Sequence, residues 1–212
     1  MSKPKSLIFT FAILIIAQSC FALSGVPDLV QSIAQIAFTG PGTASLLVVP
    51  DGSGPRFTEA HDEQGNVVDA TITLLLLDPV GAPIVNFPFE DLWLESTDGG
   101  LVGCNYGVIA DHHTDANGMT SWVNAPVAMG HSQSLVQVFV NGSALVSGPG
   151  LPLKFNSPDI NGDGFVNLQD LPLLSVDLYS TSYSFRSDFN GDGIINLQDI
   201  AIFAQHYGAQ CP

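Results

Sequence analysis

Short apolar runs separated by turn-forming residues fill the chain from about Leu46 to Phe155. The runs are rich in Val, Ile, Leu, Thr and aromatic residues, a composition that favours strands; they read ASLLVVP, DATITLLLLD, PIVNFPFEDLWLE, TSWVNAP and SLVQVFV. Between them lie turns rich in Gly, Asn, Asp and Pro, such as PDGSGP, DEQGN, DPVGAP and DANG. Because no helical period runs through this region, the pattern predicts a β-sandwich of roughly 100 residues.

The segment Leu23–Gly40 carries two competing patterns. Leu29, Ile33 and Ile36 recur at the spacing of a helix. Ile33, Ile36 and Phe38 also fit an edge strand of the sandwich. The sequence leaves both interpretations open.

The pattern changes after Gly148–Pro158, a stretch dense in Gly and Pro that predicts a short, stiff domain boundary. Two later segments carry apolar residues at helical spacing, and each predicts one amphipathic helix. These residues are Leu168, Leu171, Leu174 and Leu178 in the first segment, and Leu197, Ile200, Phe203, Ala204 and Tyr207 in the second. Gly208 is a natural stop for the second helix. A small α module is therefore expected to follow the sandwich.

The first 22 residues have the three-part pattern of an export signal. Lys3 and Lys5 form a basic start, Leu7–Ala17 is an apolar run, and Ala22 is a small residue at the end. The apolar run is shorter than the roughly 20 residues that a bilayer span needs. We therefore expect cleavage after Ala22 and no membrane insertion of the remaining chain. An uncleaved anchor is the alternative, and lipid attachment at Cys20 is not favoured because the preceding residues lack the usual Leu.

The 212-residue chain is strongly acidic, with 20 Asp and Glu residues against 5 Lys and Arg and a formal net charge of −15. Nucleic acids and anionic membranes are bound through Lys and Arg contacts, so neither is expected as a partner. Such a surface suits divalent cations. Catalysis is not expected either, because the sequence has no Ser-His-Asp signature, phosphate loop or zinc spacing.

Cleavage of the signal segment would remove Cys20 and leave Cys104 and Cys211. In an exported chain, which folds in an oxidising setting, an even pair favours a disulfide between the two. Two unpaired cysteines are the alternative, and the sequence does not decide between them.

Two twelve-residue windows, DINGDGFVNLQD at Asp159–Asp170 and DFNGDGIINLQD at Asp188–Asp199, agree at nine positions. Each window places oxygen-bearing side chains at positions 1, 3, 5, 9 and 12 and Gly at position 6, which is the spacing of an EF-hand calcium loop. The closing residue is Asp instead of the usual Glu. The predicted ligands, with the position-7 residue acting through its carbonyl, are Asp159, Asn161, Asp163, Phe165, Asn167 and Asp170 for one Ca²⁺ ion and Asp188, Asn190, Asp192, Ile194, Asn196 and Asp199 for a second.

Asp159–Tyr207 resembles a type I dockerin, in which paired DxNxDGxxNxxD loops each lead into one helix. The resemblance implies that calcium is needed for folding and that the helix faces bind a cohesin domain, which docks an exported protein onto a scaffold. Cohesin-binding dockerins often have a Ser/Thr pair just before the closing Asp, where this chain has Leu168–Gln169 and Leu197–Gln198. We expect Leu168, Gln169, Leu197 and Gln198 to face the partner, either a cohesin-like domain of a non-standard kind or a second copy of the chain.

The strand region resembles the immunoglobulin-like repeats of bacterial invasins and intimins through LLLLDPVGAPIVNFP and the later TDANGMTSW. This resemblance implies a rigid extracellular spacer or an adhesive module. The expected fold class is therefore mainly β with a small α module: an immunoglobulin-like β-sandwich followed by a dockerin-like pair of calcium loop–helix repeats. We expect a signal peptide at residues 1–22, the sandwich with an N-terminal extension at 23–157, and the dockerin-like domain at 158–212.

Three further clusters fit structural roles better than functional ones. His112–His113 lies near Asp111 and Asp115, but neighbouring strand residues point to opposite faces, so a turn explains the cluster better than a metal site. Glu90 and Asp91 are adjacent and fit poorly the two acids, about 5–10 Å apart, that glycoside hydrolysis needs. The third cluster consists of aromatic residues that could stack on a sugar: Trp93, Trp122 and Tyr106. Such residues more often belong to a core.

The function expected from the sequence is that of a secreted, non-catalytic interaction protein, located outside the cell or at its surface. One alternative is a structural or adhesive subunit of an extracellular fibre or surface layer. The other is a carbohydrate-binding or polysaccharide-degrading component held on a scaffold.

Overall fold

The computed structural model of the chain describes residues 25–105 and 107–212. The predicted signal peptide, with Cys20, lies outside the described residues, and so does Tyr106. The strands are β1 (Ile33–Ile36), β2 (Ala44–Leu47), β3 (Ala60–His61), β4 (Val67–Val68), β5 (Ile72–Leu75), β6 (Leu92–Ser96), β7 (Leu101–Gly103), β8 (Met119–Trp122), β9 (Ala128–Gly130), β10 (Val136–Val140), β11 (Ser143–Ala144) and β12 (Leu153–Asn156). The helices are α1 (Leu171–Leu178) and α2 (Leu197–Gln205), and short 3-10 turns lie at Phe57–Glu59 (η1), Phe89–Asp91 (η2) and Phe185–Ser187 (η3).

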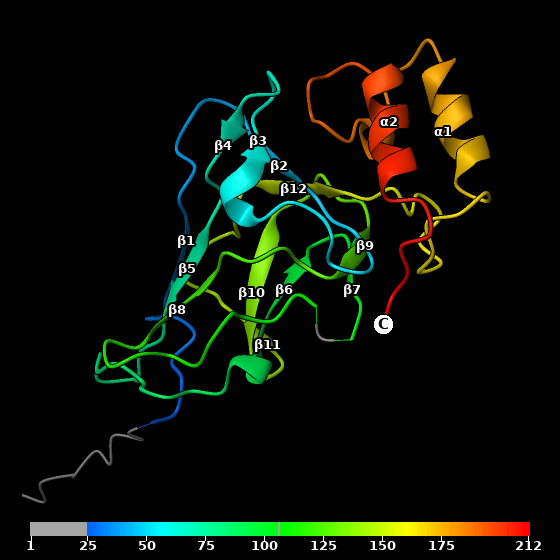
Figure 1. Ribbon diagram of the computed structural model, residues 1–212. Helices are drawn as coiled ribbons and strands as arrows, with labels where there is room; N and C mark the ends of the chain where they lie inside the picture. Colours follow the sequence, from blue (N-terminus) through cyan, green and yellow to red (C-terminus); the bar gives the residue numbers. More distant parts are fainter. Residues whose placement is uncertain (1–24, 106) are drawn as a thin grey trace, which may run out of the picture.

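The part up to residue 157, the sandwich, consists of small sheets, and residues 158–212, the loop–helix module, lie at one end of it (Figure 1). In strand order the sheets are β1-β5-β8, β11-β10-β6, β12-β2-β3-β4 and β7-β9. The strands pair antiparallel except β12 with β2, which pair parallel. Inward-facing residues of several sheets share one core that includes Leu46, Ile72, Leu92, Trp122, Val138 and Phe155. The expected fold class, mainly β with a small α module, is confirmed.

Two stretches of the sandwich show where local patterns were ambiguous. Ile33–Ile36 forms β1, an edge strand whose Ile36 lies opposite Ile72 of β5, so the helical interpretation of Leu23–Gly40 is wrong for these residues. The run PIVNFPFEDLWLE does not form one strand. Asn86 takes a left-handed φ of 58° and η2 interrupts the run, so that only β6 is extended.

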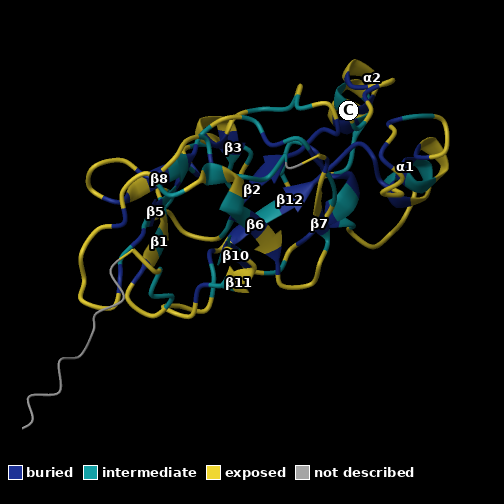
Figure 2. Cartoon of the chain, turned by 90° about the horizontal axis from the view of Figure 1, so that it is seen from below, coloured by how far each residue is buried: buried dark blue, intermediate teal, exposed yellow. Residues whose placement is uncertain are grey.

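Strand β2, an inner strand of its sheet, is buried on both faces. Its residues Ala44 and Leu46 belong to the sandwich core. Leu47 and the following Val49 point the other way and belong to the core of the loop–helix module, together with Ile160, Val166, Leu174, Phe189, Phe203 and Ala209. Because alternate residues of a strand face opposite sides, one strand serves two cores, and Figure 2 shows the buried segments continuing from the sandwich to the helices.

The two helices bury less of their apolar faces than the sequence predicts. Leu174 of α1 and Phe203 of α2 are buried, but five other residues expected on those faces are exposed: Leu168, Leu171, Leu197, Ala204 and Tyr207. Leu168 and Tyr207 lie outside the two helices. Loop residues and β2 complete the core instead. Neither helix of the described part of the chain is long and apolar enough to cross a membrane.

The structure joins Cys104, next to β7, and Cys211 in a disulfide that spans 107 residues of sequence. The tail before Cys211 runs along the first calcium-type loop. There the Cys211 N–H donates to the Gly164 carbonyl at 2.9 Å, and the Val166 N–H donates to the Ala209 carbonyl at 2.9 Å. The disulfide therefore holds the tail against the sandwich, and the tail in turn supports the first loop.

Candidate metal centre

The two loops predicted to bind calcium adopt the same hydrogen-bond scaffold. In the first loop the Asp159 carboxylate accepts the Gly164 N–H at 2.7 Å, and the Asp170 carboxylate accepts the Asn167 N–H at 2.9 Å. Gly164 has a φ of +87°, a left-handed conformation that favours glycine. The second loop repeats the pattern in the pairs Asp188–Gly193 at 2.8 Å and Asp199–Asn196 at 2.8 Å. The sequence repeat is thus also a structural repeat.

The carboxylates that open and close each loop are fully enclosed. These residues, all at 0% exposure, are Asp159, Asp170, Asp188 and Asp199. The two Lys or Arg ion pairs within the described residues, Lys154–Glu63 and Arg186–Asp177, involve none of them. Enclosed acids without a cationic partner are unfavourable by themselves, since a buried charge needs a counter-charge. The arrangement fits a bound divalent cation.

Burial also changes the proton affinity of these acids. Burial, with a further contribution from the Asp170 carboxylate, raises the pKa of Asp159 against the lowering effect of backbone N–H donors. Burial likewise raises the pKa of Asp199, and the Asp188 and Asp192 carboxylates add to the effect. Both loops therefore concentrate negative charge that a cation would offset.

The remaining predicted ligands lie around these acids. Asn167 Nδ2 donates to the Phe165 carbonyl at 3.4 Å, and Asn196 Nδ2 donates to the Ile194 carbonyl at 3.4 Å, so the position-7 and position-9 groups are neighbours in both loops. No three His, Cys, Asp or Glu side chains among residues 25–105 and 107–212 are grouped so that they alone could hold a metal ion. Each loop instead offers a mixed oxygen set of three Asp, two Asn and one carbonyl. Such a set suits calcium.

The four residues predicted to face a partner are on the surface. Leu168 is 66% exposed and Leu197 is 78% exposed, and the side chains of Gln169 and Gln198 are exposed beside them. The Gln169 and Gln198 N–H groups each donate to the position-9 Asn side chain of their loop at 2.7 Å. The loop that would hold the ion therefore also fixes the backbone that presents the exposed Leu and Gln.

The histidine pair and Trp122 do not form part of a site. His113 Nδ1 accepts the Phe89 N–H at 3.2 Å, whereas His112 Nδ1 lies 2.9 Å from the His113 carbonyl, so the two rings serve separate local contacts. Trp122 is buried in the sandwich core, and its indole N–H donates to the Val108 carbonyl at 3.0 Å. It cannot be part of a sugar platform, and Tyr106 lies outside the described residues. Trp93 remains on the outer face of the sheet, stacked on Phe139 with ring centroids 5.6 Å apart.

Two residues outside the twelve-residue windows also contact the second loop. Tyr183 Oη donates to the Asp188 carboxylate at 2.7 Å, and the Asn156 side chain donates to the Asp188 carbonyl and to the Phe185 carbonyl. Burial and the Asp188 carboxylate raise the pKa of Tyr183, so its hydroxyl stays protonated as a donor. The loop motif gives no signal for either residue, because both contacts depend on the tertiary fold.

Lowering the pH from 7.5 to 5.5 is expected to weaken the contact between sandwich and module at His206. The buried His206 Nδ1 lies 3.2 Å from Ser53 Oγ, and burial lowers the pKa of His206, against a raising effect of Asp51. The unfolded chain then binds a proton more readily than the folded chain. The contribution of neutral His206 is therefore fully present above about pH 6.5 and is lost as the pH falls toward the lowered pKa.

Urea unfolding at saturating calcium measures this effect across the pH range. The variant His206→Gln should show a smaller pH dependence of the midpoint than the parent chain. Equal pH dependence in both proteins would show that His206 has no such role.

The module thus consists of two enclosed, oxygen-rich loops, each followed by one helix with an exposed surface. The comparisons with known proteins agree: residues 157–207 match the family model described as dockerin type I domain. The chain therefore carries a type I dockerin domain in this region. Type I dockerin domains bind calcium, and dockerin domains bind cohesin partners; the domain is of a non-catalytic kind.

Similar solved structures share little sequence with this chain. The filamin domain of Lin-41 has 14% identity and a TM-score of 0.29, and the match covers 60% of this chain and 95% of that one. Two type II cohesin–X-dockerin complexes from Acetivibrio cellulolyticus also match. The C-terminal interface mutant has 19% identity and a TM-score of 0.26, and the match covers 79% of this chain and 96% of that one. The N-terminal interface mutant has 20% identity and a TM-score of 0.24, and the match covers 64% of this chain and 90% of that one. The comparison with curated proteins gave no match.

Proposed function

We propose that this chain is an exported, non-catalytic interaction protein whose dockerin domain binds two calcium ions and docks onto a protein partner while presenting the sandwich. The observation that carries the proposal is the pair of loops with the same ligand set and fully enclosed carboxylates, which pair with no Lys or Arg of the described residues. The ligands in this proposal are the six residues named above within Asp159–Asp170 and the six named within Asp188–Asp199. Calcium holds both loops closed, because it offsets charges that would otherwise repel one another.

The docking surface consists of Leu168, Gln169, Leu197 and Gln198. Exposed Leu side chains beside amide groups suit a protein interface, in which apolar anchors are ringed by polar contacts. The partner is a cohesin-like domain or a second copy of the chain. Repeated self-association would make the chain a subunit of an extracellular fibre or surface layer.

The double substitution Leu168→Asp and Leu197→Asp is expected to reduce capture of the partner at least about tenfold, because charges replace two apolar anchors. The matched control is Val67→Asp on β4, where a similarly exposed apolar residue (65%) lies on the sandwich. Capture is measured on an immobilised type I cohesin domain and on an immobilised copy of the chain, in calcium and in chelator. Absence of calcium-dependent capture on both probes, or capture by the double variant equal to that by the parent, contradicts the docking proposal.

A second function, saccharide binding by the sandwich, is favoured by a hollow of about 430 Å³ beside β6. Its lining includes Trp93, Glu90 and Glu95, and the Trp93 indole N–H donates to the Glu95 carboxylate at 2.7 Å. An aromatic ring flanked by hydroxyl-accepting carboxylates can stack on a sugar ring and hold it. The same capture assay with insoluble polysaccharides in place of protein probes tests this function, and loss of binding in Trp93→Ala would locate it.

A further inference from the structure

The two predicted calcium loops offer identical ligand sets but have different surroundings. Both supply Asp, Asn, Asp, a carbonyl, Asn and Asp in the same order. If the ligating groups alone set affinity, the two sites would bind calcium equally. The windows differ only at three apolar side chains, none of which is a ligand. We therefore look for a difference in the groups outside the loops, which in metal sites orient the ligands and change affinity by about tenfold or more.

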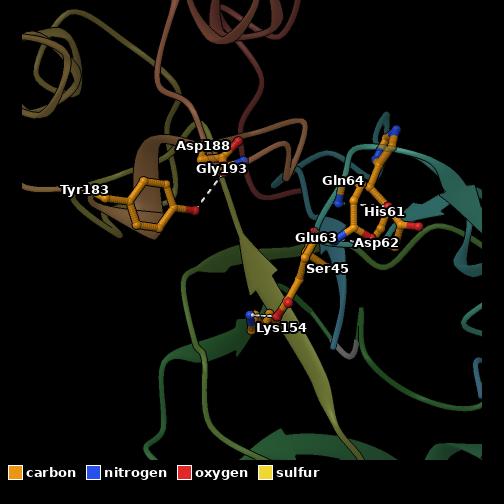
Figure 3. Close-up of polar contacts among 9 residues, drawn as sticks. All are labelled: Ser45, His61, Asp62, Glu63, Gln64, Lys154, Tyr183, Asp188 and Gly193. Carbon is orange, nitrogen blue, oxygen red and sulfur yellow. Dashed lines mark hydrogen bonds and ion pairs between the residues drawn. The ribbon is translucent and has the colours of Figure 1, made fainter. Parts of the chain in front are cut away.

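The first of these differences is a side-chain donor found only at the second loop. The Asp188 carboxylate accepts the Gly193 N–H at 2.8 Å and, on the same oxygen, the Tyr183 hydroxyl at 2.7 Å (Figure 3). The equivalent Asp159 carboxylate accepts hydrogen bonds from backbone N–H groups alone within the described residues: those of Gly162, Asp163 and Gly164. In the folded loop, Tyr183 thus fixes the orientation of the position-1 ligand.

The second difference is the position at which the sandwich contacts each loop; in the first loop it is Gly164 that lies near Met129 of β9 and Cys211. The Asn156 side chain, at the end of β12, donates to the Asp188 carbonyl. A Cβ placed on Gly191 would collide with the Ser45 hydroxyl of β2, whereas a Cβ on Gly162, at the same position of the first loop, would meet nothing within 4 Å. Both glycines have nearly the same φ, +70° and +72°. The sandwich therefore packs directly on the second loop at this position.

The segment that carries Tyr183 is also anchored to the sandwich. Lys154 of β12 pairs with Glu63 at 2.9 Å (Figure 3). Its ammonium group lies 5.9 Å from the centre of the Phe185 ring. Asn156 donates to the Phe185 carbonyl at 3.3 Å. These contacts limit the freedom of the segment between α1 and the second loop, and so they hold Tyr183 in place.

We propose that the sandwich and Tyr183 preorganise the second loop, so that it binds calcium more tightly than the first loop and fills first. Tyr183 is a positioning residue of this site: it acts through Asp188 and does not touch the ion. A ligand already held in its binding geometry loses less freedom on binding, which raises affinity without a new contact. This inference rests on the proposed calcium function.

The test is a calcium titration of the full ¹⁵N-labelled chain by NMR, in which the amide signals of Gly164 and Gly193 report the first and second loop separately. Gly193 is expected to respond at about tenfold lower free calcium than Gly164. In Tyr183→Phe, which keeps the ring and removes the hydroxyl, the Gly193 response should move to about tenfold higher calcium while the Gly164 response stays. Simultaneous response of both glycines in the parent chain, or an equal shift of both in Tyr183→Phe, overturns the inference.

Two glycine variants separate sandwich contact from backbone strain. Gly191→Ala and Gly162→Ala impose the same left-handed strain, but only the first collides with Ser45. Gly191→Ala should weaken its own site by a larger factor than Gly162→Ala weakens the first site. Equal weakening contradicts the role of the sandwich. If neither glycine signal responds to calcium in the parent chain, the calcium function itself is wrong, and this inference with it.

Discussion

Chelation of calcium is expected to unfold the loop–helix module while the sandwich keeps its structure. Four fully enclosed carboxylates would then lack a counter-charge. Calcium binding to the folded form stabilises it by about 2.7 kcal/mol per site at a hundredfold excess over Kd, and two sites double that figure. The module has two short helices and a small apolar core, part of which is supplied by Leu47 of β2. It therefore has few other contacts to offset the loss of calcium binding energy.

Limited proteolysis with mass analysis measures this result in calcium and in chelator. Cleavage in chelator should fall within residues 158–212, at segments such as α1 and α2 that are protected in calcium. Residues of the sandwich core should stay resistant under both conditions, which serves as the internal control. Equal protease resistance of residues 158–212 with and without calcium would falsify the dependence of the module on the ion.

Replacing Cys104 and Cys211 with Ser is expected to lower the free energy of unfolding by about 2–4 kcal/mol. The cross-link closes a loop of 107 residues, for which the chain-entropy model gives an upper value near about 4.7 kcal/mol. The loss should be greatest in the module, because the tail that the disulfide holds also pairs with Gly164 and Val166 of the first loop.

Urea unfolding of the double Ser variant and of the reduced parent chain measures the effect, both at saturating calcium. The two should lose similar stability, since each lacks the same covalent bond. Tryptophan fluorescence reports the sandwich through the buried Trp122. Unchanged midpoints in both proteins would show that the cross-link does not stabilise the fold.

The repeated fold of the two loops could be predicted from the sequence because their geometry is local. Twelve consecutive residues supply the oxygen donors and the glycine turn, so the spacing alone contains the pattern. The strand content was also predictable, since alternating apolar runs and turn residues are local signals. The strand over Ile33–Ile36 was not predictable, because four residues fit a helical or a strand period equally well. Only the pairing with β5 decides between the two.

The sequence could not separate a core-facing helix surface from a partner-facing one. Leu171 and Leu174 of α1 belong to one helical period, yet the first is exposed and the second is buried. Periodicity shows that one face is apolar but does not show what covers it. The same limit applies to Leu47 and Val49, whose burial depends on a module more than a hundred residues later in the chain.

The contacts between the sandwich and the second loop also lie beyond local patterns. Asn156 stands in a stretch that the sequence marks as a domain boundary, and Tyr183 lies in a polar segment with no motif. Both residues gain their roles only when β12 and the loop come together. The boundary between the two parts is consequently a packed surface, and the sandwich is more than a spacer that carries the dockerin domain.

Native mass spectrometry of the full chain, titrated with calcium, is the most direct test of the two calcium sites because it counts the bound ions. We expect two ions per chain, one ion in Asp159→Ala or in Asp188→Ala, and none when both substitutions are combined. Binding of no ion by the parent chain, or retention of two ions by the combined variant, would contradict it.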